Sequence, residues 1–157
     1  MKTIVLSGGK YAAIVDDEDY PILSRMKWHI LKKDGNLYAR NRRLGKMHQI
    51  IMPLSVKNQI VDHKDGDGLN NQKSNLRYCT TQQNGFNRDK KKSGTSKYKG
   101  VHFDKQRKLW VASITIDKEL KYLGGFEREE DAAREYDIFC TTHFKEFARP
   151  NFSEVKS

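Results

Sequence analysis

The stretch that decides the fold is Val61-Asp62-His63-Lys64-Asp65-Gly66-Asp67-Gly68-Leu69-Asn70-Asn71, which is followed by Asn75-Leu76-Arg77 and by Asn84. It places a carboxylate beside an imidazole, continues into a glycine-rich turn and then spaces out asparagines. Hydrolysis of a phosphodiester bond needs an activated water, a group that stabilises charge at the phosphate and help for the leaving oxygen. The side chains of this stretch are of the types that a small one-metal nuclease site would need.

Each polar group of the stretch suits one part of that chemistry. His63 can accept a proton from water near neutral pH while its ring is unprotonated. Asp62 and the amide oxygen of Asn84 are hard ligands that suit Mg²⁺, which keeps several water and phosphate ligands. Asn75 could form a hydrogen bond across the loop and fix the imidazole. Because neighbouring residues of a regular strand point to opposite faces, we expect the strand to end or bend at Asp62 and His63.

Simpler interpretations of these acidic residues compete with the nuclease. A lone Asp-His pair is usually a surface ion pair, and Asp65-Gly66-Asp67-Gly68 could belong to a calcium loop. The EF-hand pattern fails, because the alignment of Asp65 and Asp67 with its third and fifth positions puts Ser74 where a bidentate glutamate is required. A second acidic run, Asp16-Asp17-Glu18-Asp19, is interpreted as a solvated helix cap. His48 and His29 are interpreted as structural or DNA-facing.

The composition favours a polyanionic partner. The chain has 30 Lys and Arg against 20 Asp and Glu, a formal net charge of +10 and a pI near 9.6, which favours nucleic acid over a membrane surface. No stretch approaches the roughly 18 consecutive apolar residues of a spanning helix. Ile4-Val5-Leu6 is too short for a signal-peptide core, so we expect a cytoplasmic location, in the compartment that holds the DNA. Cys79 and Cys140 have no Cys-x-x-Cys spacing and are expected to be buried.

The first half of the chain alternates β-rich runs with short helical segments. The expected elements are a strand at 10–16, a helix from Asp19 to about Met26, strands at 28–31 and 37–40, a helix at 47–52, strands at 59–63 and 76–79, and a helix that begins at Thr80 or Thr81. The central stretch therefore lies in a strand, loop, strand, helix order.

The composition changes after Asn87. Residues 88–97 are basic and contain no apolar side chain, so they predict a linker. Beyond it, we expect strands at 98–103, 110–116 and 121–126 and a helix at 129–144. A helix packed on this three-stranded antiparallel sheet would cover one face and leave the other for a partner. In the middle strand, Trp110 and Ile114 fall on one face and Thr115 on the other.

The central motif resembles the HNH (ββα-metal) homing endonucleases of phages and mobile introns. The resemblance covers about residues 47–88 and rests on the order Val-Asp-His-x-Asp-Gly, Asn-Asn, Asn-Leu-Arg and Gln-x-Asn-x-x-Asn. It implies that His63 is the general base, that Asp62 and Asn84 bind one Mg²⁺, for which Mn²⁺ could substitute, and that Asn75 orients the histidine. The family often has histidine at the position of Asn84. Its upstream helix often has His-Arg, where this chain has His48 followed by glutamine.

The second half resembles the ethylene-response-factor (AP-two) DNA-binding domain of plants, which is also found fused to HNH nucleases. This resemblance covers about residues 96–152 and includes Tyr98-Lys99-Gly100-Val101, Tyr122-Leu123-Gly124-Gly125-Phe126 and Asn151-Phe152. It implies that the sheet lies in the major groove. The matching DNA-contact positions are Lys99, His102, Trp110, Thr115 and Tyr122. Only Trp110 retains the plant residue type, so the resemblance implies no base specificity.

Basic side chains outside the sheet are expected to contact phosphates without reading sequence. They are Arg42, Arg43, Lys90, Lys91, Lys92 and Lys97. The alternative for the basic linker is a merely solvated segment.

Together these patterns predict an α+β protein with an N-terminal ββα-metal nuclease module and a C-terminal three-stranded antiparallel sheet packed on one helix. The expected domains are 1–87, with a β-rich N-terminal extension, and 98–157, joined by the linker 88–97. We expect a monomeric Mg²⁺-dependent endonuclease whose partner is double-stranded DNA, with no protein partner indicated. The alternative is a non-catalytic DNA-binding transcriptional regulator with a degenerate nuclease module.

Overall fold

The chain divides into two compact units, Met1–Thr81 and Gln82–Ser157. The computed structural model describes residues 1–54, 56–87 and 94–152. The division falls before most of helix α3 (Thr81–Asn87), which the sequence assigns to domain 1–87. Phe86 of this helix packs in the core of the second unit. Most of the predicted linker, with Lys90, Lys91 and Lys92, lies outside the described residues.

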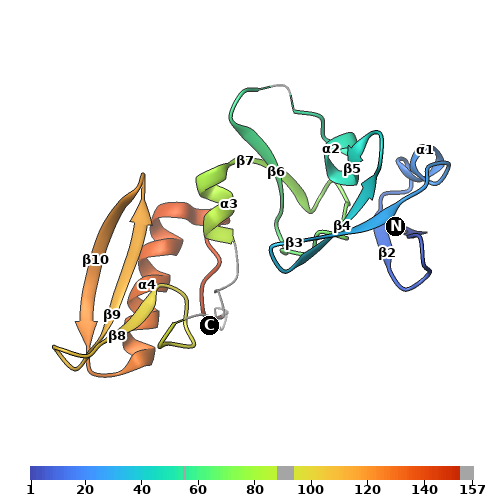
Figure 1. Cartoon of the computed structure of the whole chain (residues 1–157). Coiled ribbons are helices and arrows are strands. Elements are labelled where there is room, and N and C mark those ends of the chain that lie inside the picture. The colour runs from blue at the N-terminus through green and yellow to red at the C-terminus, as the bar shows by residue number, and fades with distance from the viewer. Residues whose placement is uncertain (55, 88–93, 153–157) are drawn as a thin grey trace. The chain divides into compact units, whose positions relative to one another are not determined.

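Small antiparallel sheets form most of the first unit (Figure 1). Strand β1 (Lys2–Val5) pairs with β2 (Ala12–Val15). In the second sheet, β4 (Asn36–Asn41) lies between β3 (His29–Lys33) and β5 (Gly45–Lys46), and in the third β6 (Gln59–His63) pairs with β7 (Leu76–Thr80). The helices α1 (Tyr20–Leu23) and α2 (Met47–Ile51) lie between these strands in the sequence. The mixed α+β class is as predicted.

A buried cluster around Trp28 forms the core of the first unit. Trp28 is 1% exposed, and its indole Nε1 donates a hydrogen bond to the carbonyl of Leu23 at 2.8 Å. This bond satisfies the polar atom of a large aromatic side chain inside the core. The same carbonyl also accepts from Met26 N–H at 3.1 Å. The sequence predicts a helix to about Met26, whereas α1 ends at Leu23.

Strand β1 was not predicted from the sequence. Ile4 and Leu6 are buried, whereas Val5 is exposed, so the side chains alternate as they do in a half-buried strand. The strand pairs with β2 from Lys2 to Val5. Its apolar run is cut off at Ser7 and the glycines that follow, so too few alternating residues were present to indicate a strand.

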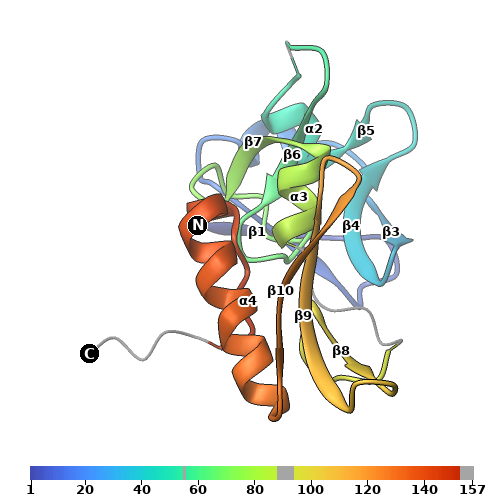
Figure 2. The ribbon, with the colours of Figure 1, turned by 90° about the vertical axis from the view of Figure 1, so that its left-hand side faces the viewer.

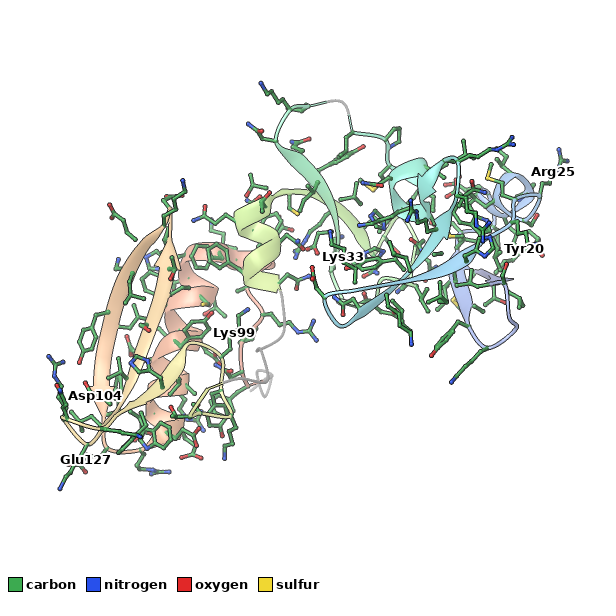
Figure 3. All side chains as sticks on the ribbon, in the orientation of Figure 1. Tyr20, Arg25, Lys33, Lys99, Asp104 and Glu127 are labelled. Atoms are coloured by element: carbon green, nitrogen blue, oxygen red, sulfur yellow. The ribbon has the colours of Figure 1, made fainter. Side chains whose placement is uncertain are left out.

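A three-stranded antiparallel sheet and one long helix form most of the second unit (Figure 1). The strands β8 (Val101–Asp104), β9 (Leu109–Ile116) and β10 (Glu119–Phe126) lie in the order β10-β9-β8, and α4 (Glu129–Phe144) is followed by the 3-10 turn η1 (Lys145–Phe147). Figure 2 shows α4 running along one face of this sheet. Asp104 and Glu127 lie at the same end of the sheet (Figure 3).

Small residues let α4 approach the sheet closely. Ala132 and Ala133 of α4 are fully buried, as is Ala112 of β9. Gly100 has φ of +75°, and a Cβ there would overlap the ring of Tyr136. Phe86 of α3 stacks on the ring of Phe144 with ring centroids 3.6 Å apart. The aromatic contact explains why α3 belongs to the second unit.

Among the described residues, no helix is both long and apolar enough to cross a membrane.

Candidate active site

Asp62 and Arg77 face each other across β6 and β7 and form a buried ion pair. The strand register pairs these two residues directly. Nε and Nη2 of Arg77 donate to Oδ2 of Asp62 at 3.1 and 2.9 Å. The side chain of Arg77 is only 9% exposed and that of Asp62 only 7%. The guanidinium compensates the charge of the carboxylate, which would be costly to bury without a partner.

The strand does not break between Asp62 and His63. β6 continues through His63, which pairs with Leu76, and the turn begins only beyond it with a bond from Gly66 N–H to the His63 carbonyl at 3.0 Å. The strand therefore ends at this pair, as expected, but its regular alternation includes both residues. As a result, the contacts of Asp62 and His63 go to different partners.

The imidazole of His63 lies in a buried aromatic and amide environment. It is 5% exposed, and its Nε2 lies 3.4 Å from Oδ1 of Asn71. The ring packs at 88° against the ring of His48, with centroids 4.8 Å apart, and is tilted against Tyr38 at 6.0 Å. Burial lowers the pKa of His63, although the bond to Asn71 and nearby carboxylates oppose this change. The neutral ring is therefore favoured near neutral pH.

The orientation of Asn71 determines which nitrogen of His63 carries the proton. Nδ2 of Asn71 donates to the carbonyl of Leu69 at 3.0 Å, so the amide oxygen faces the imidazole. A carbonyl oxygen only accepts hydrogen bonds, so Nε2 of His63 donates and the lone pair lies on Nδ1. The sequence shows Asn71 only as part of an Asn-Asn pair, and this role was not predicted.

Asn75 braces the loop and does not bond the imidazole, which corrects the predicted role. Its Oδ1 accepts from the backbone N–H of Asp65 at 3.1 Å. Its Nδ2 donates to Oδ1 of Asp65 and to the carbonyl of Asn70, both at 2.9 Å. The predicted hydrogen bond across the loop is therefore present. The side chain that reaches His63 is that of Asn71 instead, because these loop groups occupy Asn75.

The carboxylate of Asp65 organises the glycine-rich loop. It accepts hydrogen bonds from Asp67 N–H at 2.9 Å and from Nδ2 of Asn70 at 2.7 Å, in addition to the bond from Asn75. Burial raises the pKa of Asp65, but these hydrogen bonds lower it by more, so the net pKa is lowered. Because loop donors engage these oxygens, the calcium-loop interpretation gains no support.

The N-terminal strands and the acidic run hold this loop in place. Ile14 of β2 bonds on both sides of Asn70, since its N–H donates to the Leu69 carbonyl and its carbonyl accepts from Asn71 N–H, each at 2.8 Å. Asp16 accepts from Lys73 N–H at 2.7 Å. The ammonium of Lys73 also pairs with Glu18 and Asp19. The acidic run ends at Asp19, the N-cap of α1, as predicted, although without a side-chain cap hydrogen bond, and it also anchors the loop.

His48 is a buried neighbour of His63. The sequence left open whether His48 has a structural role or contacts DNA. His48 lies on α2, is 4% exposed, and its Nδ1 has no hydrogen-bond partner among the described residues. Burial lowers the pKa of His48 to about 3, with a smaller effect from His63 and Lys46. The contact joins segments far apart in the sequence, so residue spacing offered no signal for it.

Asn84, the other predicted metal ligand, is half-buried on α3. Most of this helix belongs to the second unit, whereas Asp62 belongs to the first. The metal pair of Asp62 and Asn84 therefore remains a prediction. Asp16, Glu18 and Asp19 have ligand atoms within 4.8 Å of one another, but Lys73 already neutralises part of their charge.

The predicted DNA-contact residues of the sheet separate into two groups. His102, Thr115 and Tyr122 are exposed on the face opposite α4, since the register pairs His102 with Val111 and Tyr122 with Ser113. Trp110, also expected to contact DNA, lies on the other face. Its ring packs on the core side of the sheet, with its centroid 5.0 Å from that of Phe103. The outer face is therefore a candidate DNA surface without Trp110.

The basic residues predicted to contact phosphates also differ in their surroundings. Arg42 and Arg43 are exposed in the turn between β4 and β5. Nζ of Lys97 pairs with Glu130 at 3.3 Å. Nζ of Lys99 donates to the carbonyl of Phe86 on α3. The first two are thus the more available for a phosphate.

Comparisons with known proteins relate the segment that contains β6 and β7 to nucleases. Residues 53–86 match an HNH endonuclease family. An uncharacterised HNH endonuclease of Acanthamoeba polyphaga mimivirus is 38% identical over 158 residues, which covers 95% of this chain and 79% of the relative. The chain therefore belongs to the HNH endonuclease family.

Two further relatives match parts of the chain. Protein 3.8 of Escherichia phage T7 is 36% identical over 61 residues, 39% of this chain and 50% of that protein. The AP2/ERF and B3 domain-containing transcription factor RAV1 of Arabidopsis thaliana is 35% identical over 74 residues, 47% of this chain and 21% of that protein. No solved structure matches the chain.

Proposed function

We propose that the protein is a Mg²⁺-dependent, homing-type DNA endonuclease that hydrolyses phosphodiester bonds in duplex DNA. The observation that carries this proposal is the buried, neutral His63, next in sequence to the buried Asp62 at the end of β6, within the segment that matches the HNH endonuclease family. The net charge of +10 supports a DNA substrate. We further propose a monomer that acts in the cytoplasm, where the DNA is.

The donor set at Asp62 fits a divalent metal ion, on which HNH nucleases generally depend. Asp62 is a buried carboxylate that already faces one cation, the guanidinium of Arg77. Asn84 would add a second hard oxygen ligand, and such ligands suit Mg²⁺, with Mn²⁺ as a substitute. The bound ion would stabilise negative charge at the phosphate and the leaving oxygen.

His63 activates the attacking water in this proposal. Asn71 keeps the proton on Nε2, so Nδ1 is the atom that accepts a proton from water. The contact with His48 limits rotation of the ring. Asn75 contributes through the loop, because its bonds to Asp65 keep the turn after His63 closed.

The second unit holds duplex DNA in this proposal. The outer face of its sheet presents His102, Thr115 and Tyr122. Partial identity to a plant protein whose name includes an AP2/ERF domain supports this assignment. Arg42, Arg43, Lys97 and Lys99, together with Lys90, Lys91 and Lys92, add positive charge for phosphates.

The second candidate is a DNA-binding regulator without catalysis. The observation that favours it is the ion pair with Arg77, which already compensates the charge of Asp62. Incubation of the protein with supercoiled plasmid in Mg²⁺, with and without EDTA, separates the two. We expect nicked or linear DNA only in the presence of Mg²⁺. Intact plasmid despite tight DNA binding would favour the regulator.

A further inference from the structure

The carboxylate of Asp62 pairs with the guanidinium of Arg77 in the structure and would bind a metal ion in the proposed function. Two nitrogens of Arg77, Nε and Nη2, donate to Oδ2. The pair lies between adjacent strands in register, and both side chains are at least nine-tenths buried. A divalent metal ion held by Asp62 would therefore lie close to a guanidinium that is fixed by its own strand.

We propose that Arg77 is the resident counter-ion of Asp62, that it weakens divalent-metal binding to the DNA-free protein, and that it thereby makes metal loading depend on bound DNA. This inference rests on the proposed function, because it takes Asp62 as a metal ligand. In the DNA-free protein Arg77 acts through Asp62, as a positioning residue.

The charges give the direction of the effect. Without metal, the single charges of Asp62 and Arg77 compensate each other. A divalent cation at the same carboxylate is repelled by the guanidinium, and this repulsion is strong away from bulk water. Nearby Asp65 does not relieve it, because hydrogen bonds from Asp67, Asn70 and Asn75 engage its carboxylate.

A DNA phosphate changes this balance. It brings a negative charge to the site, and a guanidinium matches the oxygens of a phosphate as well as those of a carboxylate. The metal and the guanidinium can then share two anionic groups instead of one. Because coupling between two binding sites is reciprocal, the metal should strengthen DNA binding by the same factor by which DNA strengthens metal binding.

The coupling can be measured with Mn²⁺, whose free concentration is followed by electron paramagnetic resonance. The full-length chain carries His63→Ala to prevent cleavage, and each protein is titrated with and without a short duplex. Asp62→Asn with the same duplex defines binding outside the site. We expect the duplex to strengthen Mn²⁺ binding at Asp62 by about tenfold or more. Equal affinity with and without the duplex would overturn the inference without requiring any change at Arg77.

A charge-removing variant tests Arg77 itself. We expect Arg77→Gln to bind Mn²⁺ about tenfold more tightly without DNA and to lose most of the enhancement by the duplex. Arg77→Lys keeps the charge and should resemble the parent. Arg25→Gln is the matched control, since Arg25 is exposed after α1 and projects outward there (Figure 3).

The outcomes separate this inference from the proposed function. Unchanged or weaker Mn²⁺ binding by Arg77→Gln, in a variant whose circular dichroism matches the parent, would refute the counter-ion role while Asp62 remains a ligand. Mn²⁺ binding that is the same in Asp62→Asn and the parent in both DNA states would refute the metal site, and with it both proposals.

Discussion

His63 lies where its neutral form is favoured and its ring is held on two sides. Asn71 fixes the proton on Nε2, and His48 packs against the ring at a right angle. A base that works near neutral pH must be unprotonated and must point at the water that it activates. Burial meets the first requirement, because it lowers the pKa of His63, and the two neighbours meet part of the second.

His48 should make the protein acid-sensitive. Its pKa is lowered to about 3 from 6.5, so the stability that depends on its neutral ring is fully present above about pH 6.5 and is lost as the pH falls toward 3. Between pH 6.5 and pH 5 the loss in free energy of unfolding amounts to about 2 kcal/mol. Urea unfolding at a series of pH values measures it.

The variant His48→Phe keeps an aromatic ring but cannot titrate, so its unfolding free energy should depend less on pH over this range. Some dependence will remain, because the pKa of His63 is lowered as well. The matched control is His143→Phe, since His143 is exposed on α4. An unchanged pH dependence in His48→Phe would contradict the assignment.

The spacing of the motif indicated which residues belong to the site, but it did not show which hydrogen bonds they form. The motif placed Asp62 and His63 at the end of a strand and Asn75 across the loop that follows, and the structure has Asp62 and His63 in β6 and Asn75 bonded to Asp65 of that loop. It could not show that Asn71 reaches the imidazole, because two adjacent asparagines are equivalent in a pattern until the turn assigns their directions. Arg77 was visible only as part of Asn-Leu-Arg, although antiparallel register would have placed it opposite Asp62.

The loop between β6 and β7 is the element on which the site depends. Its backbone is bonded to Ile14 of β2, and its acceptor groups are satisfied within the turn. Gly68 lies against β4, where a Cβ would overlap the carbonyl oxygen of Leu37 and the ring of Tyr38. The N-terminal extension is therefore a support for the site.

Gly68→Ala should destabilise the protein by about 1–3 kcal/mol, because β4 must move to admit the methyl group. Gly85→Ala is the matched control, since Gly85 lies in α3 with nothing within 4 Å of an added Cβ. Alanine there should stabilise the protein by about 0.5–1 kcal/mol. Thermal and urea unfolding compare the two, and equal effects would contradict the close approach at Gly68.

Element types were predictable where the pattern was long. Strands β9 and β10 and helix α4 lie close to their predicted ranges, because each has enough residues to show its period. Strand β1 and the early end of α1 were missed, since four residues carry little periodicity. The alternation of side chains along β9 already places Trp110 on the same face as Ile114, which is buried. Trp110 was nevertheless predicted to contact DNA, because it matches a DNA-contact position of the plant domain.

At the scale of the whole molecule, a nuclease motif and a sheet with one open face occur in one basic chain. Phosphate contacts dominate the affinity of such proteins for DNA and make it fall with salt. The outer sheet face carries few charges of its own, so its role would be to fit the groove while basic side chains elsewhere contact the backbone. The family relationship supports the nuclease half of this account.

A carboxylate on the outer sheet face should interfere with DNA binding. Tyr122 is 56% exposed on that face, and Ile138 is 60% exposed on α4. Tyr122→Glu and Ile138→Glu add the same charge, so a difference between them reports position. We expect Tyr122→Glu to weaken duplex binding by about tenfold more than Ile138→Glu, measured by fluorescence anisotropy at low salt. Equal effects would argue against the sheet as the DNA surface.

The most direct test of the central claim is the rate of plasmid cleavage in Mg²⁺ by His63→Ala relative to the parent protein, with His143→Ala as the matched control. The account predicts a loss of about 100-fold or more for His63→Ala, because the general base is removed, and no loss for His143→Ala. Cleavage that is undiminished in His63→Ala would contradict the assignment of the base and the mechanism built on it.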